Sequence, residues 1–286
     1  MRCRYRENIY KCGEYLEVDI FPTFHRGSGR RRKRYKPTSE MQARLNQRNA
    51  ERMLTRLLNE NFSKGDLEVT LTYSNANLPD SKEQAERDAK NYIRRVKRLR
   101  SKAKLEEMRY VVIPGGGRTH FHIIMTGGIE REKLEAIWGK GYANTKRLAP
   151  DGDGLAGLAC YIARQYEVDA YDGNDLFSGY EIEAETGEVT ERDGSVRRKG
   201  KKRFWGSKNL IRPEAETRDG RISQARIEEL ATIDSFSREA WESIYPGYSF
   251  SRCEPQYNQE NGGWYIHVRL RREEQRRAKK SPRHIT

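Results

Sequence analysis

The sequence predicts an α+β fold in which a central antiparallel β-sheet carries flanking helices packed on one side of it. Segments with strand-like alternation and segments with helical periodicity follow one another through the middle of the chain, separated by glycine- and aspartate-rich turns. Apolar residues make up only 35% of the 286 residues and charged residues 34%. The core must therefore be modest, and a compact domain must carry extensions.

The elements of the expected core begin near residue 65. Alternation and β-branching indicate the strands, while an apolar stripe at a spacing of three and four residues indicates the helices. Gly127 and Gly128 end the strand that begins at His120, which we expect to be central in the sheet. The predicted order is strand 67–73, helix 82–104, strand 110–113, strand 120–126, helix 130–138, strand 142–148 and helix 155–168.

The two flanks of this core are more polar and less regular. The first contains a strand at 15–21, a basic arm at 26–36 and a helix that ends near residue 59. The second contains a polar hairpin at 181–198, a strand at 264–270 and a basic tail. We therefore divide the chain into an N-terminal extension (1–64), a core (65–175) and a C-terminal region (176–286).

The charge of the chain indicates a polyanionic partner. The formal net charge is +14, and the cations occur in blocks, so nucleic acid is favoured over an ordinary basic enzyme surface. Anionic lipid is disfavoured, because no basic helix has a bulky apolar face. No apolar run approaches the roughly 20 residues of a bilayer span, and no export signal is visible. We expect a cytoplasmic protein whose four cysteines are free thiols.

The most informative residues are two histidines in the strand 120–126. Side chains two apart in a strand point to the same face, so His120 and His122 present two imidazoles side by side, with Phe121 on the opposite face. Two imidazole nitrogens can bind a divalent cation. The alternative is a pair of surface histidines on an edge strand.

A tyrosine in the helix 155–168 is the second chemical feature. Helical spacing places Tyr161, Arg164 and Gln165 on one face, while Leu155, Leu158 and Ile162 face the sheet. A phenol is a weak nucleophile at neutral pH and needs a base, a positive potential or a metal. The alternative for Tyr161 is packing in the core.

These features resemble the HUH endonucleases (His-hydrophobic-His), and in particular the rolling-circle replication initiators of phages, plasmids and mobile elements. The specific part is His120-Phe121-His122 followed by Tyr161-Ile162-Ala163-Arg164, and the likeness extends over residues 36 to about 212. Supporting segments are Leu-Thr-Tyr at 71–73, Leu-Pro at 78–79, the basic helix around 91–95, Ile-Trp-Gly at 137–139 and the segment 203–210.

The resemblance implies an RRM- or ferredoxin-like core and a known reaction. His120 and His122 would hold Mg²⁺ or Mn²⁺ on the scissile phosphate. Tyr161 would attack in line, giving a 5′-phosphotyrosyl DNA and a 3′-OH that primes a polymerase. Arg164 would stabilise charge on the phosphate or the leaving oxygen. Because Gln165 stands where two-tyrosine initiators have their second nucleophile, a one-tyrosine enzyme is expected.

The chain departs from the resemblance at the third metal ligand. Many relatives have a glutamate before the histidine motif, but the corresponding stretch here, residues 112–116, has no carboxylate. Gln165 is our replacement, because it lies one turn past Tyr161, and Glu107 is a weaker candidate.

The expected partners are single-stranded DNA and an origin stem-loop, bound by a monomer or weak dimer. No Gly-x-x-x-x-Gly-Lys-Ser/Thr loop occurs, so a host helicase and DNA polymerase would open and copy the DNA. Tyr73 is expected to stack on a base, with core packing as its rival. Further DNA contacts are expected from Arg94, Arg95, Arg98, Arg118, Lys202, Arg203, Trp205 and Lys208.

The sequence therefore supports a hypothesis of origin-specific nicking and joining of single-stranded DNA. One alternative is another enzyme of the same chemistry, a transposase or a mobilisation relaxase. The other is a non-catalytic basic nucleic-acid-binding protein with a structural metal.

Overall fold

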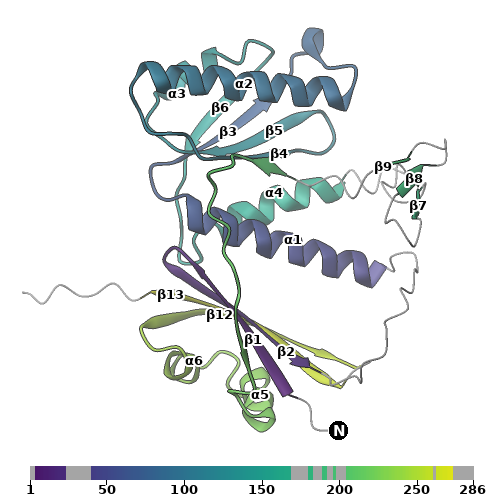
Figure 1. Cartoon of the computed structure of the whole chain (residues 1–286), viewed down its shortest axis with the longest axis vertical. Coiled ribbons are helices and arrows are strands. Elements are labelled where there is room, and N and C mark those ends of the chain that lie inside the picture. Colours follow the sequence, from purple (N-terminus) through teal and green to yellow (C-terminus); the bar gives the residue numbers. More distant parts are fainter. Residues whose placement is uncertain are drawn as a thin grey trace, which may run out of the picture. The chain divides into compact units, whose positions relative to one another are not determined.

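A computed structural model describes most of the chain. The described residues are 4–23, 40–168, 180–182, 189–191, 196–197, 204–259 and 262–272, with side chains described in 4–23, 47–163, 204–259 and 262–272. The predicted basic arm at 26–36 and the basic tail lie outside them. Within these residues the chain has six α-helices and two five-stranded antiparallel sheets, so the predicted α+β fold is confirmed (Figure 1).

The chain divides into two compact units, one formed by residues 26–213 and the other by the two ends, 1–25 and 214–286. The prediction of three consecutive segments did not include a sheet between the two ends. A short third sheet pairs β7 (Tyr180–Ile182), β8 (Val189–Glu191) and β9 (Val196–Arg197), in the region where a polar hairpin was predicted.

The unit 26–213 is built on a ferredoxin-like core. Along the chain it runs strand, helix, strand, strand, helix, strand, and the strands lie in the sheet order β4-β5-β3-β6, with β10 added beside β4. The histidine strand β5 is therefore central, as predicted. The elements are β3 (Leu67–Thr72), α2 (Lys82–Lys102), β4 (Tyr110–Pro114), β5 (His120–Met125), α3 (Arg131–Ala136), β6 (Ala143–Arg147) and β10 (Trp205–Gly206).

Helices α2 and α3 cover one face of this sheet (Figure 1). The hydroxyl of Ser81 accepts the N–H of Gln84 and begins α2, and basic residues in the last turn suit the negative end of the helix dipole. Tyr92 of α2 is buried and its hydroxyl donates to the carbonyl of Leu134 in α3. The core on this face joins these helices to the odd-numbered residues of β3 and β5, such as Val69 and Ile123.

Helices α1 (Glu40–Asn61) and α4 (Ala156–Val168) cover the other face, so the expectation of helices on one side only is wrong (Figure 1). The cause is a second apolar surface: Val111, Ile113 and Ile124 alternate out of phase with the first core and are fully or almost fully buried. The Asn59 side chain accepts the Leu155 N–H and ties α1 to the start of α4.

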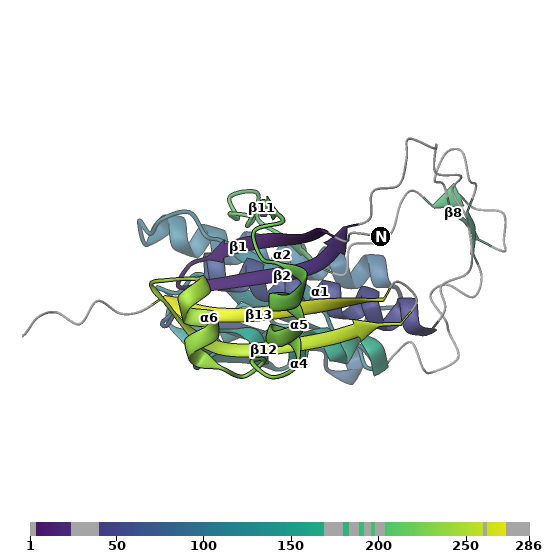
Figure 2. The same cartoon turned by 90° about the horizontal axis from the view of Figure 1, so that it is seen from below.

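The unit formed by the two chain ends is a sheet in the order β11-β1-β2-β13-β12 with two helices on one face (Figure 2). The predicted strands at 15–21 and 264–270 are β2 and β13, which pair directly. Trp241 is fully buried under the sheet. The elements are β1 (Arg4–Cys12), β2 (Tyr15–Thr23), β11 (Glu216–Asp219), α5 (Gln224–Ala231), α6 (Arg238–Ile244), β12 (Tyr248–Asn258) and β13 (Gly263–Arg272).

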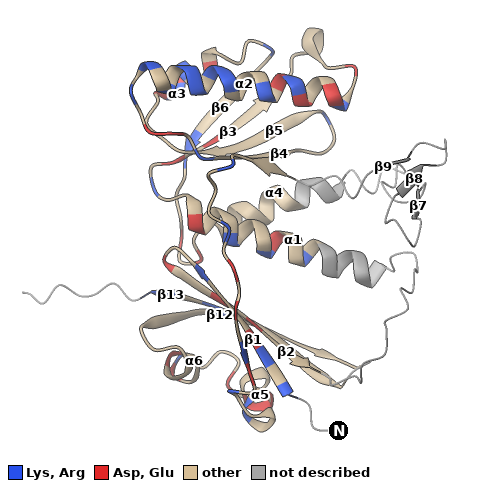
Figure 3. Ribbon diagram, in the orientation of Figure 1, with Lys and Arg blue, Asp and Glu red and all other residues tan. Residues whose placement is uncertain are grey.

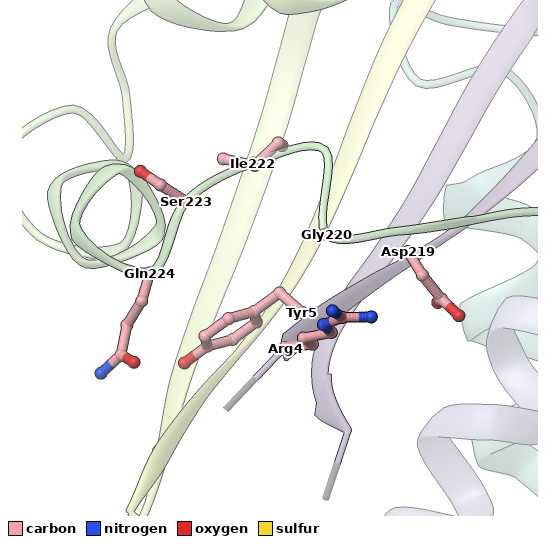
Figure 4. Close-up of a pocket in the computed structure, with 7 residues that line it drawn as sticks. All are labelled: Arg4, Tyr5, Asp219, Gly220, Ile222, Ser223 and Gln224. Atoms are coloured by element: carbon pink, nitrogen blue, oxygen red, sulfur yellow. The ribbon is translucent and has the colours of Figure 1, made fainter. Parts of the chain in front are cut away.

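A hollow of about 390 Å³ lies in this unit between the start of β1 and the start of α5 (Figure 4). Its charged groups are already paired or at the rim, since Asp219 accepts from Arg6 at 2.6 Å. The Tyr5 hydroxyl accepts the backbone N–H of Trp264. The polar groups of this hollow therefore serve the packing of the unit itself.

Two further findings concern membranes and thiols. In the part of the chain that the structure describes, no helix is both long and apolar enough to cross a bilayer. Cys12, Cys160 and Cys253 are free thiols, as predicted. Burial raises the pKa of the Cys253 thiol to about 12, so this thiol stays protonated at neutral pH.

Candidate functional site

The α1/α4 face of the sheet changes from apolar to polar as it is crossed from β4 to β6. Strand pairing aligns one residue from each of the four strands in a row, and three such rows make up the face. From β4 to β6 the rows read Val111, Ile124, Glu68 and Lys146; then Ile113, His122, Thr70 and Asn144; then Gly115, His120, Thr72 and Tyr142.

The apolar half of this face is covered by α1 and α4, and the polar half borders a cavity of about 710 Å³. A helix gains little by covering threonine, asparagine and lysine side chains, because each would lose water contacts on burial. The cavity therefore lies over β3 and β6. Its lining residues are Glu68, Thr70, Thr72, Arg118, Thr119, His120, His122, Tyr142, Asn144, Lys146, Gly157, Leu158 and Tyr161.

The two histidines lie side by side at the boundary between the halves. Their ring centroids are 5.1 Å apart and their planes are almost perpendicular. His122 is 3% exposed, and His120 is half-buried. The His120 Nδ1 lies 2.8 Å from the Arg118 carbonyl oxygen, which can only accept, so this nitrogen carries the proton and Nε2 carries the ring's lone pair.

A carboxylate that the sequence analysis missed contacts His122. Glu68 Oε1 lies 3.2 Å from His122 Nδ1, and the Thr70 hydroxyl lies 3.4 Å from the same nitrogen. Glu68 is only 15% exposed in its side chain. A carboxylate at Nδ1 orients an imidazole and directs its lone pair to Nε2. The alternation of β3 already placed Glu68 on the polar face, but its register against β5 cannot be read from the sequence.

Tyr161 lies against this histidine pair. Its ring centroid is 6.1 Å from that of His122, and its side chain is 57% exposed in the cavity. The core-packing alternative for Tyr161 is therefore wrong. Leu155 and Ile162 are buried and Leu158 packs against them, as predicted, so α4 presents Tyr161 to the sheet's polar half. The side chains of Arg164 and Gln165 lie outside the described residues.

Gly115 allows His120 to take its position. A Cβ atom at residue 115 would lie 2.0 Å from His120 Nε2, far inside van der Waals contact. The imidazole therefore lies over bare backbone at the end of β4. Any larger residue at 115 must displace this ring.

The donor set fits a divalent cation in part. Two imidazoles on adjacent positions of one strand face supply nitrogen ligands, and Glu68 supports one of them from the side. Within the residues whose side chains are described, no three His, Cys, Asp or Glu groups gather closely enough to complete a site. Glu107 is exposed and is not among the residues that line the cavity. Further ligands must come from Gln165, from substrate or from water.

Two predicted DNA-binding residues, Arg118 and Tyr73, differ in their outcome. Arg118 is exposed at the cavity, and its guanidinium donates to the Tyr73 carbonyl at 2.8 Å. Tyr73 itself is 3% exposed, its hydroxyl donates to Asp88, and its ring contacts Trp138. Stacking of Tyr73 on a base is therefore wrong, and the core alternative is correct. Burial is the main cause that raises its pKa well above the usual range.

The basic helix α2 lies on the face of the sheet opposite the cavity (Figure 3). Arg94, Arg95 and Arg98 are exposed there; Arg94 donates to Asn91, and Arg95 donates to the Ile137 carbonyl. A strand of DNA that reaches both surfaces must pass around an edge of the sheet.

The 199–208 segment is only partly described. Trp205 is half-buried on β10, where its ring contacts Tyr110 and lies under the ammonium of Lys90. Lys208 is exposed in the turn that follows. Lys202 and Arg203 lie outside the described residues.

The fold and the site together define a class: an α+β protein whose central strand bears paired imidazoles, with a tyrosine on a helix against them and a cationic, polar cavity beside them. Residues 66–166 match the model of a family of replication-associated proteins, the ORF2 family. This match confirms the predicted resemblance to replication proteins over the segment that contains the histidines, Glu68 and Tyr161. Comparison with curated proteins and with solved structures gave no match.

Proposed function

We propose that this chain nicks and rejoins single-stranded DNA at a replication origin, with Tyr161 as nucleophile and a divalent metal, and so initiates rolling-circle replication. The observation that carries this proposal is the contact between the Tyr161 and His122 rings, 6.1 Å apart between centroids, in one cavity with His120. The match to replication-associated proteins favours initiation over transposition or plasmid mobilisation.

In the proposed reaction, the Tyr161 oxygen forms a bond to the scissile phosphorus. The bond from phosphorus to the 3′ oxygen breaks, the phenol loses its proton, and the leaving oxygen gains one as a free 3′-OH. The covalent link conserves the phosphodiester, so the 3′-OH can later reverse the step and rejoin the strand. Exposure of the phenol in the cavity leaves room for a DNA strand at its oxygen.

His120 and His122 would hold Mg²⁺ or Mn²⁺, with Gln165 as the proposed third protein ligand. Such a cation supplies Lewis acidity and orients the phosphate when it is bound. The chain's own residues do the rest: Glu68 fixes the ring of His122, and Arg118 and Lys146 place positive charge at the cavity. Arg164 is proposed to stabilise the charge of the phosphate and leaving oxygen.

The DNA beyond the cavity would be held by cations elsewhere on the chain. We propose that Arg94, Arg95, Arg98 and Lys208, with Lys202, Arg203 and Trp205, contact the flanking strand or stem-loop. The chain has no P-loop, so a host helicase and a host DNA polymerase would open and copy the DNA.

The proposal is tested by trapping the covalent adduct. The protein is incubated with Mn²⁺ and labelled single-stranded oligonucleotides that tile its own reading frame and flanking DNA, and adducts are resolved on a denaturing gel. We expect one adduct-forming sequence, and we expect Tyr161→Phe to abolish the adduct. The matched control is Tyr166→Phe, because residue 166 is on the same helix but is turned by more than a quarter turn from residue 161.

An adduct that persists in Tyr161→Phe would remove this residue from its role. Retained DNA binding with no adduct under any metal condition would instead support the non-catalytic alternative.

A further inference from the structure

The edge strand β6 lines the cavity with residues that the proposed cutting reaction does not use. Tyr142, Asn144 and Lys146 all point to the polar face, because they alternate with residues on the opposite face such as Ala143 and Thr145, which are buried. The outer side of β6 has no further strand in this sheet, among the residues that the structure describes. A ligand can therefore approach β6 from the side of the sheet as well as from the cavity.

Tyr142 is an aromatic ring held out in water beside the histidine pair. Its side chain is 70% exposed, although an apolar ring of this size is usually at least partly covered. The backbone beneath it is fixed, since its carbonyl accepts both the N–H and the hydroxyl of Thr72 at 2.9 Å. Thr72 separates it from His120 in the same row, so the ring lies about 10 Å from the histidine strand at ~4.8 Å per strand.

Lys146 places a cation at the other end of the same strand. It is exposed, and it lies about 13 Å from Tyr142 at ~3.3 Å per residue. Its neighbour across the sheet is Glu68, whose carboxylate contacts His122. Asn144 and Thr70 lie between the two ends and offer amide and hydroxyl groups to base edges.

We infer that β6 is a binding site for unpaired nucleotides next to the cut phosphate: Tyr142 stacks on a base, and Lys146 pairs with the phosphate of a neighbouring nucleotide. An exposed ring, polar hydrogen-bonding groups and a cation along one groove are the features that bind single strands. A duplex does not suit this groove, because a stacked and paired base offers no face to Tyr142. The site rests on the proposed function for its place beside the scissile phosphate, but base stacking itself needs neither metal nor nucleophile.

The test measures binding without metal in the Tyr161→Phe background, so that cutting plays no part. The probe is fluorescein-labelled oligo(dT), read by anisotropy, intact or with one abasic position moved along it. Tyr142→Ala should weaken binding about 5- to 100-fold, while Tyr142→Trp should bind about as tightly as Tyr142 itself. The matched control is Tyr257→Ala, which removes an exposed tyrosine from an edge strand outside the cavity and should change nothing.

The abasic series distinguishes stacking from general destabilisation. With Tyr142 present, one abasic position should weaken binding most, and Tyr142→Ala should remove that sensitivity. Equal affinity of Tyr142→Ala and its parent, or an undiminished abasic penalty in Tyr142→Ala, would overturn the stacking role. Lys146→Ala should lower the slope of log affinity against log salt by about 0.7, the value for one single-strand phosphate contact, and an unchanged slope would overturn the phosphate role. Failure of adduct trapping would leave all these outcomes readable.

Discussion

At the scale of single residues, the site depends on how two imidazoles are held. His120 lies over the bare backbone of Gly115 and is fixed through the Arg118 carbonyl. His122 is buried and has Glu68 and Thr70 at its Nδ1. Each ring is thus oriented by a group at Nδ1, which favours Nε2 as the nitrogen for a metal.

From this arrangement we predict different effects for Glu68 and Gln165 on Mn²⁺ affinity in the absence of DNA. Glu68→Ala should lower the affinity about 10- to 100-fold and should let His122 populate both neutral tautomers, seen in its imidazole ¹⁵N shifts. Gln165→Ala should lower the affinity but leave the His122 tautomer unchanged, because a ligand acts on the metal and not on the ring. Glu132→Ala, on the exposed surface of α3, is the control.

Unchanged ¹⁵N shifts in Glu68→Ala would show that this carboxylate does not position His122. Unchanged affinity and cleavage in Gln165→Ala would refute its assignment as a ligand.

Several of these residues could be found from the sequence, and the physical reason separates those from the rest. The histidine pair and the Tyr161 helix were predictable because strand and helix periodicities are local. The burial of Tyr73 was also within reach, since it shares the parity of Leu67, Val69 and Leu71. Glu68 and Tyr142 were missed, because their approach to the histidines depends on strand register, which pairs residues far apart in the chain.

At the scale of elements, the sheet of the 26–213 unit separates two cationic surfaces. The cavity side has Arg118 and Lys146, and the far side has the exposed cations of α2. The expected helix at 82–104 was correct, and its apolar stripe predicted which residues are buried. The location of its cations relative to the site was not predictable, because the sequence does not show which face of the sheet a helix covers.

We predict that the α2 surface binds DNA that extends beyond the cavity. A triple variant, Arg94→Gln, Arg95→Gln and Arg98→Gln, should weaken a long single strand and lower its salt slope by about 2, at roughly 0.7 per phosphate contact. An oligonucleotide just long enough to fill the cavity should bind the triple variant and the wild type equally. Arg238→Gln, which removes an exposed cation of α6, is the control.

Equal salt slopes of the triple variant and wild type on the long strand would make α2 an ordinary solvated helix face. A loss on the short oligonucleotide as well would indicate a defect in folding instead.

At the scale of the whole molecule, the chain closes one of its two units with its own ends. Strand β2 near the start pairs with β13 near the end, and Arg269 of β13 forms a buried ion pair with Glu17 of β2 at 3.0 Å. The separate strands were predicted, but their pairing was not, since hydrophobic patterning does not identify a partner more than 200 residues away.

We predict that the two units unfold separately. A fragment of residues 26–213 should keep a cooperative urea transition and the Tyr161-dependent adduct, because its cores use no residue of the other unit. Deletion of 264–272 should abolish the transition of the other unit, since it removes the strand between β2 and β12. The measurements are tryptophan fluorescence and adduct trapping on each protein.

Loss of cooperative unfolding in the 26–213 fragment would contradict this division. A full-length protein with β13 deleted that still gave two transitions would contradict the assigned sheet.

The edge position of β6 has a consequence for how such proteins diversify. A strand with a neighbour on one side only can exchange its outward residues without forcing compensating changes across the sheet. The histidine strand, flanked on both sides and packed above and below, has no such freedom. New replicons could therefore acquire a different target sequence through substitutions at 142, 144 and 146, while the machinery that breaks the strand is inherited intact.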